Sequence, residues 1–259
     1  MHKSILLISL FFLLATSLHG RDLYVIYDGE IGTDAWHGLE QGIAEANTQG
    51  KFLGLTYLIA HIQDAVDIKD NANTVIVSTR SNLTVTKVAY NYPTIPIFAI
   101  LPDQPDTVRP CVKNILYTLP SADIISKVTK LWRTNTTESR GHAQAWHFTF
   151  KKYAAAQLNK RFTKATGKPM TDESWAAWAA VKLFSDIAAR SPAPSKLLLK
   201  QDEINNLAFD GQKGVDLNFN STRELLQPLL IVENNKIISE LDLETLNKLR
   251  DTNSKMCTN

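Results

Sequence analysis

Apolar residues follow two different spacings along the chain, and the alternation between them predicts the architecture. Between short apolar runs lie segments with apolar residues three or four positions apart, such as GLEQGIAEANTQG, where Leu39, Ile43 and Ala46 share one helical face. Such an alternation of strands and helices favours an α/β fold with a parallel sheet covered by helices on both faces. The runs predicted as strands are 23–29, 53–62, 73–79, 94–102 and 114–120.

Polar residues at the segment ends indicate where the predicted helices of this first part begin. Thr33 or Asp34 can cap a helix that continues to Asn47, and Ser121 can cap a helix that continues to Trp132. Two further helices are predicted at 63–71 and 81–92. Residues 21–134 are therefore predicted to form one doubly wound α/β lobe.

The pattern changes after residue 134. Polar residues without periodicity predict a linker at 135–141, and residues 142–259 are predicted as a second, mainly helical unit with a short C-terminal β segment. The helices expected in this unit are 143–165, 172–190 with Thr171 as its cap, a short one at 195–206, and one that runs from its cap Asp242 to Arg250. Strands are expected at 215–219, 228–232 and 236–240.

The first 20 residues are expected to be removed as a secretory signal peptide. A basic start at Lys3 precedes an apolar run from Ile5 to Leu14, and small residues follow up to Gly20. This run is shorter than the roughly 20 residues that span a bilayer, and a retained anchor is the alternative. No other segment of the sequence approaches membrane length, so we expect an exported mature protein that is not embedded in the membrane.

Composition and charge narrow the class of protein. Hydrophobic residues make up 44% and charged residues 21%, which is typical of a globular protein, and the formal net charge of +2 gives no reason to expect a nucleic acid partner. The two cysteines, Cys111 and Cys257, form an even count, which favours a disulfide in an exported protein; two free thiols are the alternative. Neither lies in a CxxC pair, so neither a zinc site nor redox chemistry is expected.

The order of the segments resembles a known family. GLEQGIAEANTQGKFLG, NTVIVST, PTIPIFAI and NILYTLPSAD follow one another as in the first lobe of the type 1 periplasmic binding proteins, which include the branched-chain amino-acid binders. LAFDGQKGVDLNFN, followed by LLQPLLIVENNKI, is similar to that family's closing motif near the hinge. Residues 145–188 resemble a subgroup of ABC-transporter substrate-binding proteins associated with PQQ-dependent alcohol dehydrogenase systems, and the positions of the two cysteines fit the same subgroup.

This resemblance implies a periplasmic protein that is not an enzyme, carries no cofactor and binds a small molecule between two lobes. An ABC transporter permease or a PQQ-dependent dehydrogenase is the implied partner. The sequence departs from the family after Trp132, where roughly 100 residues of a second doubly wound lobe are expected and polar residues follow instead. The alternative is therefore an accessory protein that docks on a dehydrogenase, a transporter or itself and no longer binds a solute.

The candidate ligand site lies at the carboxyl ends of the predicted strands, where open parallel sheets bind ligands. Serine and threonine hydroxyls there can donate hydrogen bonds, and the guanidinium of Arg80 can bind a carboxylate through two parallel bonds. In the alternative interpretation Ser81 and Ser121 only cap helices and Arg80 extends into solvent. The candidate residues are Ser78, Thr79, Arg80, Ser81, Ile100, Leu101, Tyr117, Thr118 and Ser121.

Other candidate chemistry is sparse. The sequence contains no GxSxG, HExxH, P-loop or GxGxxG pattern, so no catalytic residue is assigned. His142 and His147 do not share a helical face, and we expect them on the surface rather than as metal ligands. Trp175 and Trp178 are interpreted as part of a helix core, with an aromatic cage for a cofactor as the alternative.

Overall fold

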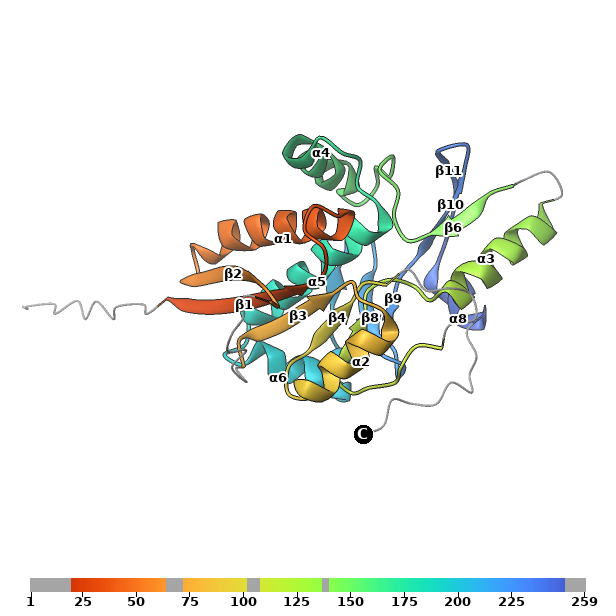
Figure 1. The fold of residues 1–259 in the computed structure, drawn as a ribbon. Helices are drawn as coiled ribbons and strands as arrows, with labels where there is room; N and C mark the ends of the chain where they lie inside the picture. The colour runs from red at the N-terminus through yellow and green to blue at the C-terminus, as the bar shows by residue number, and fades with distance from the viewer. Residues whose placement is uncertain (1–19, 64–71, 102–107, 137–139, 250–259) are drawn as a thin grey trace, which may run out of the picture.

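The protein is built around a five-stranded parallel sheet (Figure 1). The computed structural model describes residues 20–63, 72–101, 108–136 and 140–249. The strand order is β2-β1-β3-β4-β5, and every pair of neighbours is parallel, as the sequence predicts. The strands are β1 (Arg21–Asp28), β2 (Leu55–His61), β3 (Thr74–Ser78), β4 (Ile97–Ala99) and β5 (Ile115–Tyr117).

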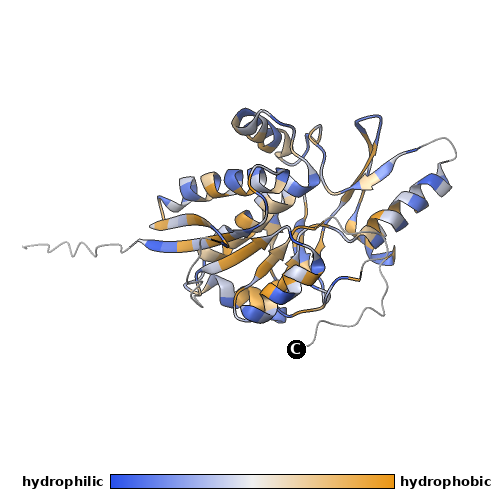
Figure 2. Cartoon of the chain, viewed as in Figure 1, coloured by the Kyte–Doolittle hydropathy of each residue, from blue (hydrophilic) through white to orange (hydrophobic). Residues whose placement is uncertain are grey.

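Helices cover both faces of this sheet, which confirms the predicted α/β class. Alternate residues of a strand point to opposite faces, so Val25 joins the core beneath α1 (Asp34–Gly50) and α5 (Asp172–Ala188). Its neighbour Ile26 joins the core beneath α2 (Asn82–Asn91) on the other face. Apolar residues are accordingly concentrated in the strands between these helices (Figure 2).

Helices α1 and α5 approach each other through small residues. A Cβ atom added to Gly38 would lie 1.9 Å from the backbone oxygen of Ser174, and one added to Gly42 would lie 2.8 Å from Cβ of Val181. These two glycines are one helical turn apart, so their spacing lets the backbones come close along one stripe. The apolar pattern of α1 does not reveal this contact, because glycine carries no hydrophobic side chain.

A smaller antiparallel sheet in the order β11-β10-β6 lies to one side of the main sheet. Ile124 and Val128 of α3 (Ala122–Asn135) pack with Ile231 of the sheet and Leu246 of α8 (Leu243–Leu249). The strands of this sheet are β6 (His142–Gln144), β10 (Leu229–Glu233) and β11 (Lys236–Leu241). The remaining elements are α4 (Ala155–Thr166), α6 (Pro194–Leu199), α7 (Gln201–Asn205), β7 (Phe209–Asp210), β8 (Asp216–Phe219) and β9 (Leu225–Leu226).

Side-chain packing crosses the predicted linker at 135–141 in both directions. The helix α5 follows the linker, yet Trp178 and Val181 share a core with the main sheet, because α5 is apolar on nearly every side. The helix α3 precedes the linker, yet it packs on the smaller sheet.

Several predicted elements differ in the structure. A helix from residue 143 is wrong, because 142–144 form β6 and α4 begins only at Ala155. Tyr153 and Ala154 have φ angles of 51° and 68°, in the left-handed region that a right-handed helix cannot contain. The helix predicted at 195–206 is divided into α6 and α7 at Lys200, whose backbone is extended. The two-residue strands β7 and β9 were not predicted.

The predicted helix caps are confirmed. The side chain of Thr33 accepts a hydrogen bond from the backbone N–H of Trp36 at 3.3 Å. Thr171 begins α5 with a capping box, in which its side chain and that of Ser174 each accept a backbone N–H bond. Asp242 accepts the backbone N–H of Thr245 at 2.8 Å and so caps α8.

Three sequence predictions fall on residues outside the described part of the chain. They are the signal peptide, nearly all of the helix at 63–71, and Cys257, so the disulfide to Cys111 stays a prediction. Within the described ranges, no helix combines the length and the hydropathy that crossing a membrane requires.

Candidate functional site

The ends of β1 and β3 meet at the point where the strand order of the main sheet reverses. From β1 the chain continues to the edge strand β2, and from β3 it continues to β4 on the other side. In open α/β sheets, ligands bind at the carboxyl ends of the strands beside such a switch point. Asp28 and Ser78 are the last residues of β1 and β3, and they are partners in the register of the two strands.

Three side chains form a hydrogen-bonded cluster at this switch point. Ser78 donates from Oγ to Oδ2 of Asp28 at 2.9 Å, and Nε of Arg80 donates to Oδ1 of Asp28 at 3.2 Å. The backbone N–H of Arg80 donates to Oγ of Ser78 at 3.3 Å. We call Asp28, Ser78 and Arg80 the switch-point cluster.

The geometry of the cluster leaves part of Arg80 available. Its side chain is 39% exposed, whereas that of Asp28 is only 6% exposed. Among the described residues, the Arg80 side chain makes its hydrogen bond through Nε alone, so its two terminal nitrogens can bind a carboxylate through two parallel bonds. Asp28 therefore orients the guanidinium, which neither extends freely into solvent nor lies buried.

The other predicted site residues have different surroundings. Ser81 and Ser121 are helix caps, each accepting a backbone N–H bond at 3.4 Å. Ile100 and Leu101 are buried in the core. Of the predicted residues, Ser78 and Arg80 belong to the switch-point cluster, and Thr79 lies between them in the sequence. Tyr117 and Thr118 are buried at the end of β5, where the Tyr117 hydroxyl donates to the carbonyl of Pro110 at 2.9 Å.

Sequence reasoning missed Asp28, which lies within the predicted strand 23–29 and was not among the candidate site residues. The available signal was an acidic residue directly after a buried apolar strand, at a sheet end where a carboxylate needs a partner. The neighbouring backbone is tightly packed: a Cβ atom on Gly29 would lie 2.4 Å from Oγ1 of Thr79, and a ring nitrogen of His61 lies 2.8 Å from the Gly29 carbonyl oxygen.

Polar side chains also form hydrogen bonds to the chain segments that pass between the main and the smaller sheet. Gln227 donates to the carbonyl of Thr118 at 2.8 Å, and so joins the segment before β10 to the segment after β5. Arg109 donates to the carbonyls of Leu119 and Pro120 at 2.9 and 3.0 Å.

The buried Lys213 joins two of these crossing segments. Its ammonium donates to the carbonyl of Ala145, between β6 and α4, and to that of Pro228 before β10. It lies 4.4 Å from the ring centre of Trp175, which stacks on Trp146 at 5.7 Å. Trp175, which was expected in a helix core, is buried as predicted, and the cation beside its ring is the Lys213 ammonium of the same chain.

The charge of Lys213 is balanced by Asp172, the first residue of α5. The Asp172 carboxylate accepts the backbone N–H groups of Trp146 at 2.6 Å and of Ala145 at 3.2 Å. Burial lowers the pKa of Lys213 to about 7, against the attraction of Asp172, and burial raises the pKa of Asp172 to about 6. Both shifts have the same cause, which is the loss of water around a charged group.

These pKa values predict how stability changes between pH 7 and pH 10. The folded state releases the Lys213 proton near pH 7, while the unfolded chain retains it to about pH 10.4, so the unfolded state binds more protons in this window. We therefore expect Lys213 to make the free energy of unfolding rise with pH across it. Urea unfolding of the wild type and of Lys213→Met at pH 7, 8.5 and 10 measures the rise of the free energy of unfolding with pH. The rise should be smaller in the variant, and an equal rise in both proteins would contradict the assignment.

The two candidate histidines are separated. His142 is exposed, as expected, but the expectation for His147 is wrong: it is buried, and its ring nitrogens contact the side-chain oxygens of Thr149 at 2.7 Å and Asn235 at 3.1 Å. Burial lowers the pKa of His147. Among the described residues, no group of three or more His, Cys, Asp or Glu is placed to hold a metal ion.

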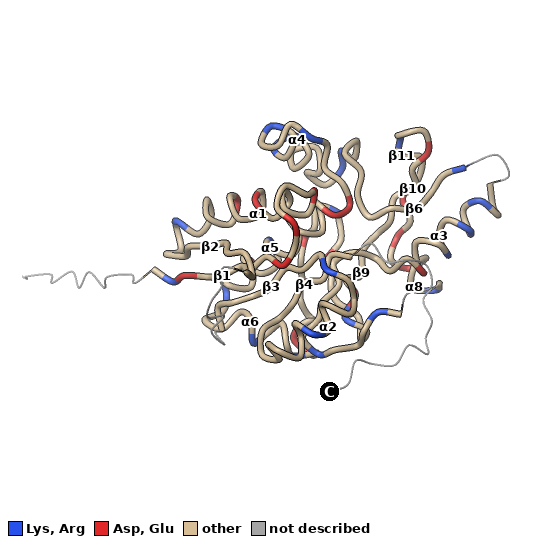
Figure 3. Tube along the Cα trace, viewed as in Figure 1, with Lys and Arg blue, Asp and Glu red and all other residues tan. Residues whose placement is uncertain are grey.

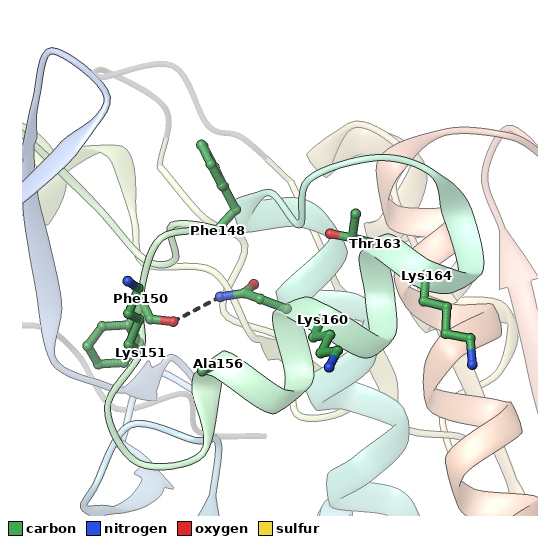
Figure 4. A pocket seen from close by; sticks show the side chains of 8 residues that line it. Phe148, Phe150, Lys151, Ala156, Lys160, Thr163 and Lys164 are labelled. Carbon is green, nitrogen blue, oxygen red and sulfur yellow. Dashed lines mark hydrogen bonds between the residues drawn. The ribbon is translucent and has the colours of Figure 1, made fainter.

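Two hollows on the described surface lie away from the switch-point cluster. The larger, of about 520 Å³, lies beside α4 and is lined by residues of α4 and of the segment 148–151 (Figure 4). The smaller, of about 370 Å³, lies between the start of β2 and the end of α5. Within the cluster Asp28 and Ser78 are buried, and Arg80 is the member that reaches the surface.

Comparison with known proteins identifies the fold. No family model and no curated protein matches the sequence. Similar solved structures include an ABC transporter substrate-binding protein from Desulfitobacterium hafniense in complex with Leu, at a TM-score of 0.63 and 10% identity over 85% of this chain and 100% of that one. A periplasmic binding protein from Burkholderia mallei has a TM-score of 0.66 at 9% identity over 91% and 98% of the two chains.

A third similar structure carries a different ligand. The solute binding protein of an ABC transporter from R. palustris, in complex with benzoate, has a TM-score of 0.56 at 10% identity over 85% of this chain and 95% of that one. At such low identity these likenesses show the fold alone. The chain therefore has the fold of the type 1 periplasmic binding proteins.

Proposed function

We propose that this protein is a solute-binding module of the periplasmic binding-protein type, which binds a small carboxylate at the switch-point cluster. The observation that carries the proposal is the orientation of Arg80 by Asp28, which leaves two guanidinium nitrogens available where the strand order reverses. The fold agrees with this role. Two of its structural neighbours are described in complex with Leu and with benzoate, both of which carry a carboxylate.

The compartment and the partners of the protein are a further part of the proposal. The resemblance of residues 145–188 to binding proteins of PQQ-dependent alcohol dehydrogenase systems supports a role in the periplasm, beside an ABC transporter permease or a dehydrogenase. The basic and apolar N-terminus supports export with removal of a signal peptide. We also propose that its second lobe is shorter than that of the family and that the protein is not an enzyme.

The alternative function, docking on another protein without a solute, is favoured by one surface. Phe52 is 87% exposed just before the edge strand β2, and Leu53, Leu58 and Ile59 beside it are also exposed. Apolar side chains gathered on a sheet edge are typical of protein contacts. Sedimentation velocity of the wild type and of Phe52→Ser distinguishes self-association at this edge from a monomer.

Calorimetric titration tests the solute site through Arg80. With L-leucine and benzoate as probes, we expect at least one to bind the wild type and its dissociation constant to rise at least tenfold in Arg80→Gln, because a charge-assisted pair of hydrogen bonds is lost. Arg190→Gln is the matched control, since Arg190 is exposed and the residues around it, Ala188 and Ser191, accept hydrogen bonds from Arg21 at the start of β1, the opposite end of that strand from Asp28. Equal affinities in the two variants would contradict the site.

A further inference from the structure

A groove beside α4 carries a concentration of positive charge that the solute site does not explain. Segment 151–168 contains six basic residues and no acidic one, although the whole chain has a formal net charge of only +2. Basic positions accordingly gather on α4 and the turn before it (Figure 3). The six residues are Lys151, Lys152, Lys160, Arg161, Lys164 and Lys168.

Half of these basic residues have partners on neighbouring elements. Lys152 pairs with Glu240 at 2.7 Å, and Arg161 pairs with Glu45 at 2.7 Å. Lys168 lies 3.3 Å from a ring nitrogen of His37. The other three, Lys151, Lys160 and Lys164, form no ion pair with any acidic residue in the described part of the chain, and all three line the groove.

The floor of the groove is apolar. Phe148 is 37% exposed at one side, Phe150 forms part of the wall, and the small side chain of Ala156 leaves room between them and α4. Figure 4 shows the segment of Phe148 to Lys151 facing the helix, fixed by a hydrogen bond from the Asn159 amide to the Phe150 carbonyl at 3.0 Å. The groove therefore combines one exposed aromatic side chain, that of Phe148, with three ammonium groups around it.

The shape of the groove favours an extended chain over a small molecule. Its helical side is formed by positions 156, 160, 163 and 164, which share one face and extend over about 12 Å. An extended peptide of about four residues has that length. The groove is open along its side, whereas small-molecule sites enclose most of their ligand.

We propose that this groove binds an acidic segment of a partner protein, with one apolar side chain against Phe148 and flanking carboxylates on Lys151, Lys160 and Lys164. Complementary charge is the reason for an acidic partner. Phe148 is the one exposed aromatic side chain of the groove lining, which is enough apolar surface for a peptide side chain but little for insertion into the interior of a bilayer.

Fluorescence anisotropy with the labelled hexapeptide EDFEDE tests the proposal at 50 mM salt. The wild type should bind it saturably, and Lys160→Glu with Lys164→Glu should raise the dissociation constant at least tenfold. The matched control is Lys87→Glu with Lys130→Glu, which changes the net charge equally at exposed lysines of α2 and α3 and should stay within twofold of the wild type. The wild type should bind the peptide EDAEDE at least threefold more weakly than EDFEDE. The variant Phe148→Ala should bind EDFEDE at least threefold more weakly than the wild type does.

Three results would overturn the proposal. The first is no saturable binding by the wild type. The second is equal weakening in the two double variants, which would mean that net charge alone attracts the peptide. The third is tighter binding of a 20-nucleotide single strand or of phosphatidylglycerol vesicles through the same lysines, which would assign the surface to that class instead. Circular dichroism of each variant verifies that it is folded.

Discussion

Replacing Asp172 with alanine is expected to lower the free energy of unfolding by about 3–5 kcal/mol. The substitution leaves the buried ammonium of Lys213 without an opposite charge, and it leaves the N–H groups of Ala145 and Trp146 without their acceptor. Because these groups belong to a segment that passes between the two sheets, we expect the whole structure to be weakened. Urea unfolding at pH 6.5, between the pKa values of Asp172 and Lys213 in the fold, measures the change.

The adjacent Glu173 provides the control for this prediction. It lies in the same first turn of α5 and carries the same charge, but no hydrogen bond to the crossing segment is found for it among the described residues. Glu173→Ala should cost less than about 1 kcal/mol, which is the usual size of the interaction of an acid with a helix N-terminus. Similar losses in the two variants would mean that only the helix end is affected. The double variant Asp172→Asn with Lys213→Met should recover part of the loss, because it removes both charges together.

Replacing Gly38 with alanine should destabilise the protein by about 2 kcal/mol, the opposite of what helix propensity predicts. In an exposed helix this change stabilises by about 1 kcal/mol. Here the new Cβ atom would lie 1.9 Å from the backbone oxygen of Ser174, so α1 and α5 must move apart. The sign of the change in the free energy of unfolding therefore decides whether the close contact exists.

Ala44→Gly is the matched control for the helix contact. Ala44 is an exposed position of the same helix, so this variant should lose about 1 kcal/mol through propensity alone. If Gly38→Ala instead stabilised the protein by the amount that Ala44→Gly costs, the packing of α1 on α5 would be contradicted.

The sequence was sufficient to predict the main sheet, because its information is local. Five short apolar runs with turn residues between them fix the parallel strands, and Ser81, Ser121 and Thr171 fix helix starts. The spatial neighbours of a helix are not local information. Nothing in the periodicity of α5 indicates that it packs on α1, whose glycines form the contact surface.

The candidate site shows the same division. The loop with Ser78 and Arg80 could be predicted, because parallel strands place their carboxyl ends on one edge. The role of Asp28 could not, because it depends on β1 and β3 being neighbours, and 50 residues of sequence separate Asp28 from Ser78. Likewise the interaction of Lys213 with Asp172 joins residues about 40 positions apart, and Asp172 accepts the backbone N–H groups of residues 145 and 146, where a helix was predicted.

The most direct test of the central claim, that the switch-point cluster binds a small carboxylate, is the melting temperature of the mature protein against a panel of ligands. The panel contains amino acids, short organic acids, benzoate, short alcohols and pyrroloquinoline quinone. A ligand at one hundred times its dissociation constant adds about 2.7 kcal/mol, which raises the melting temperature by about 5–10 °C at this size. We predict such a shift with a carboxylate for the wild type, and at most a small one for Arg80→Gln. A cooperative transition that no carboxylate moves would contradict the claim.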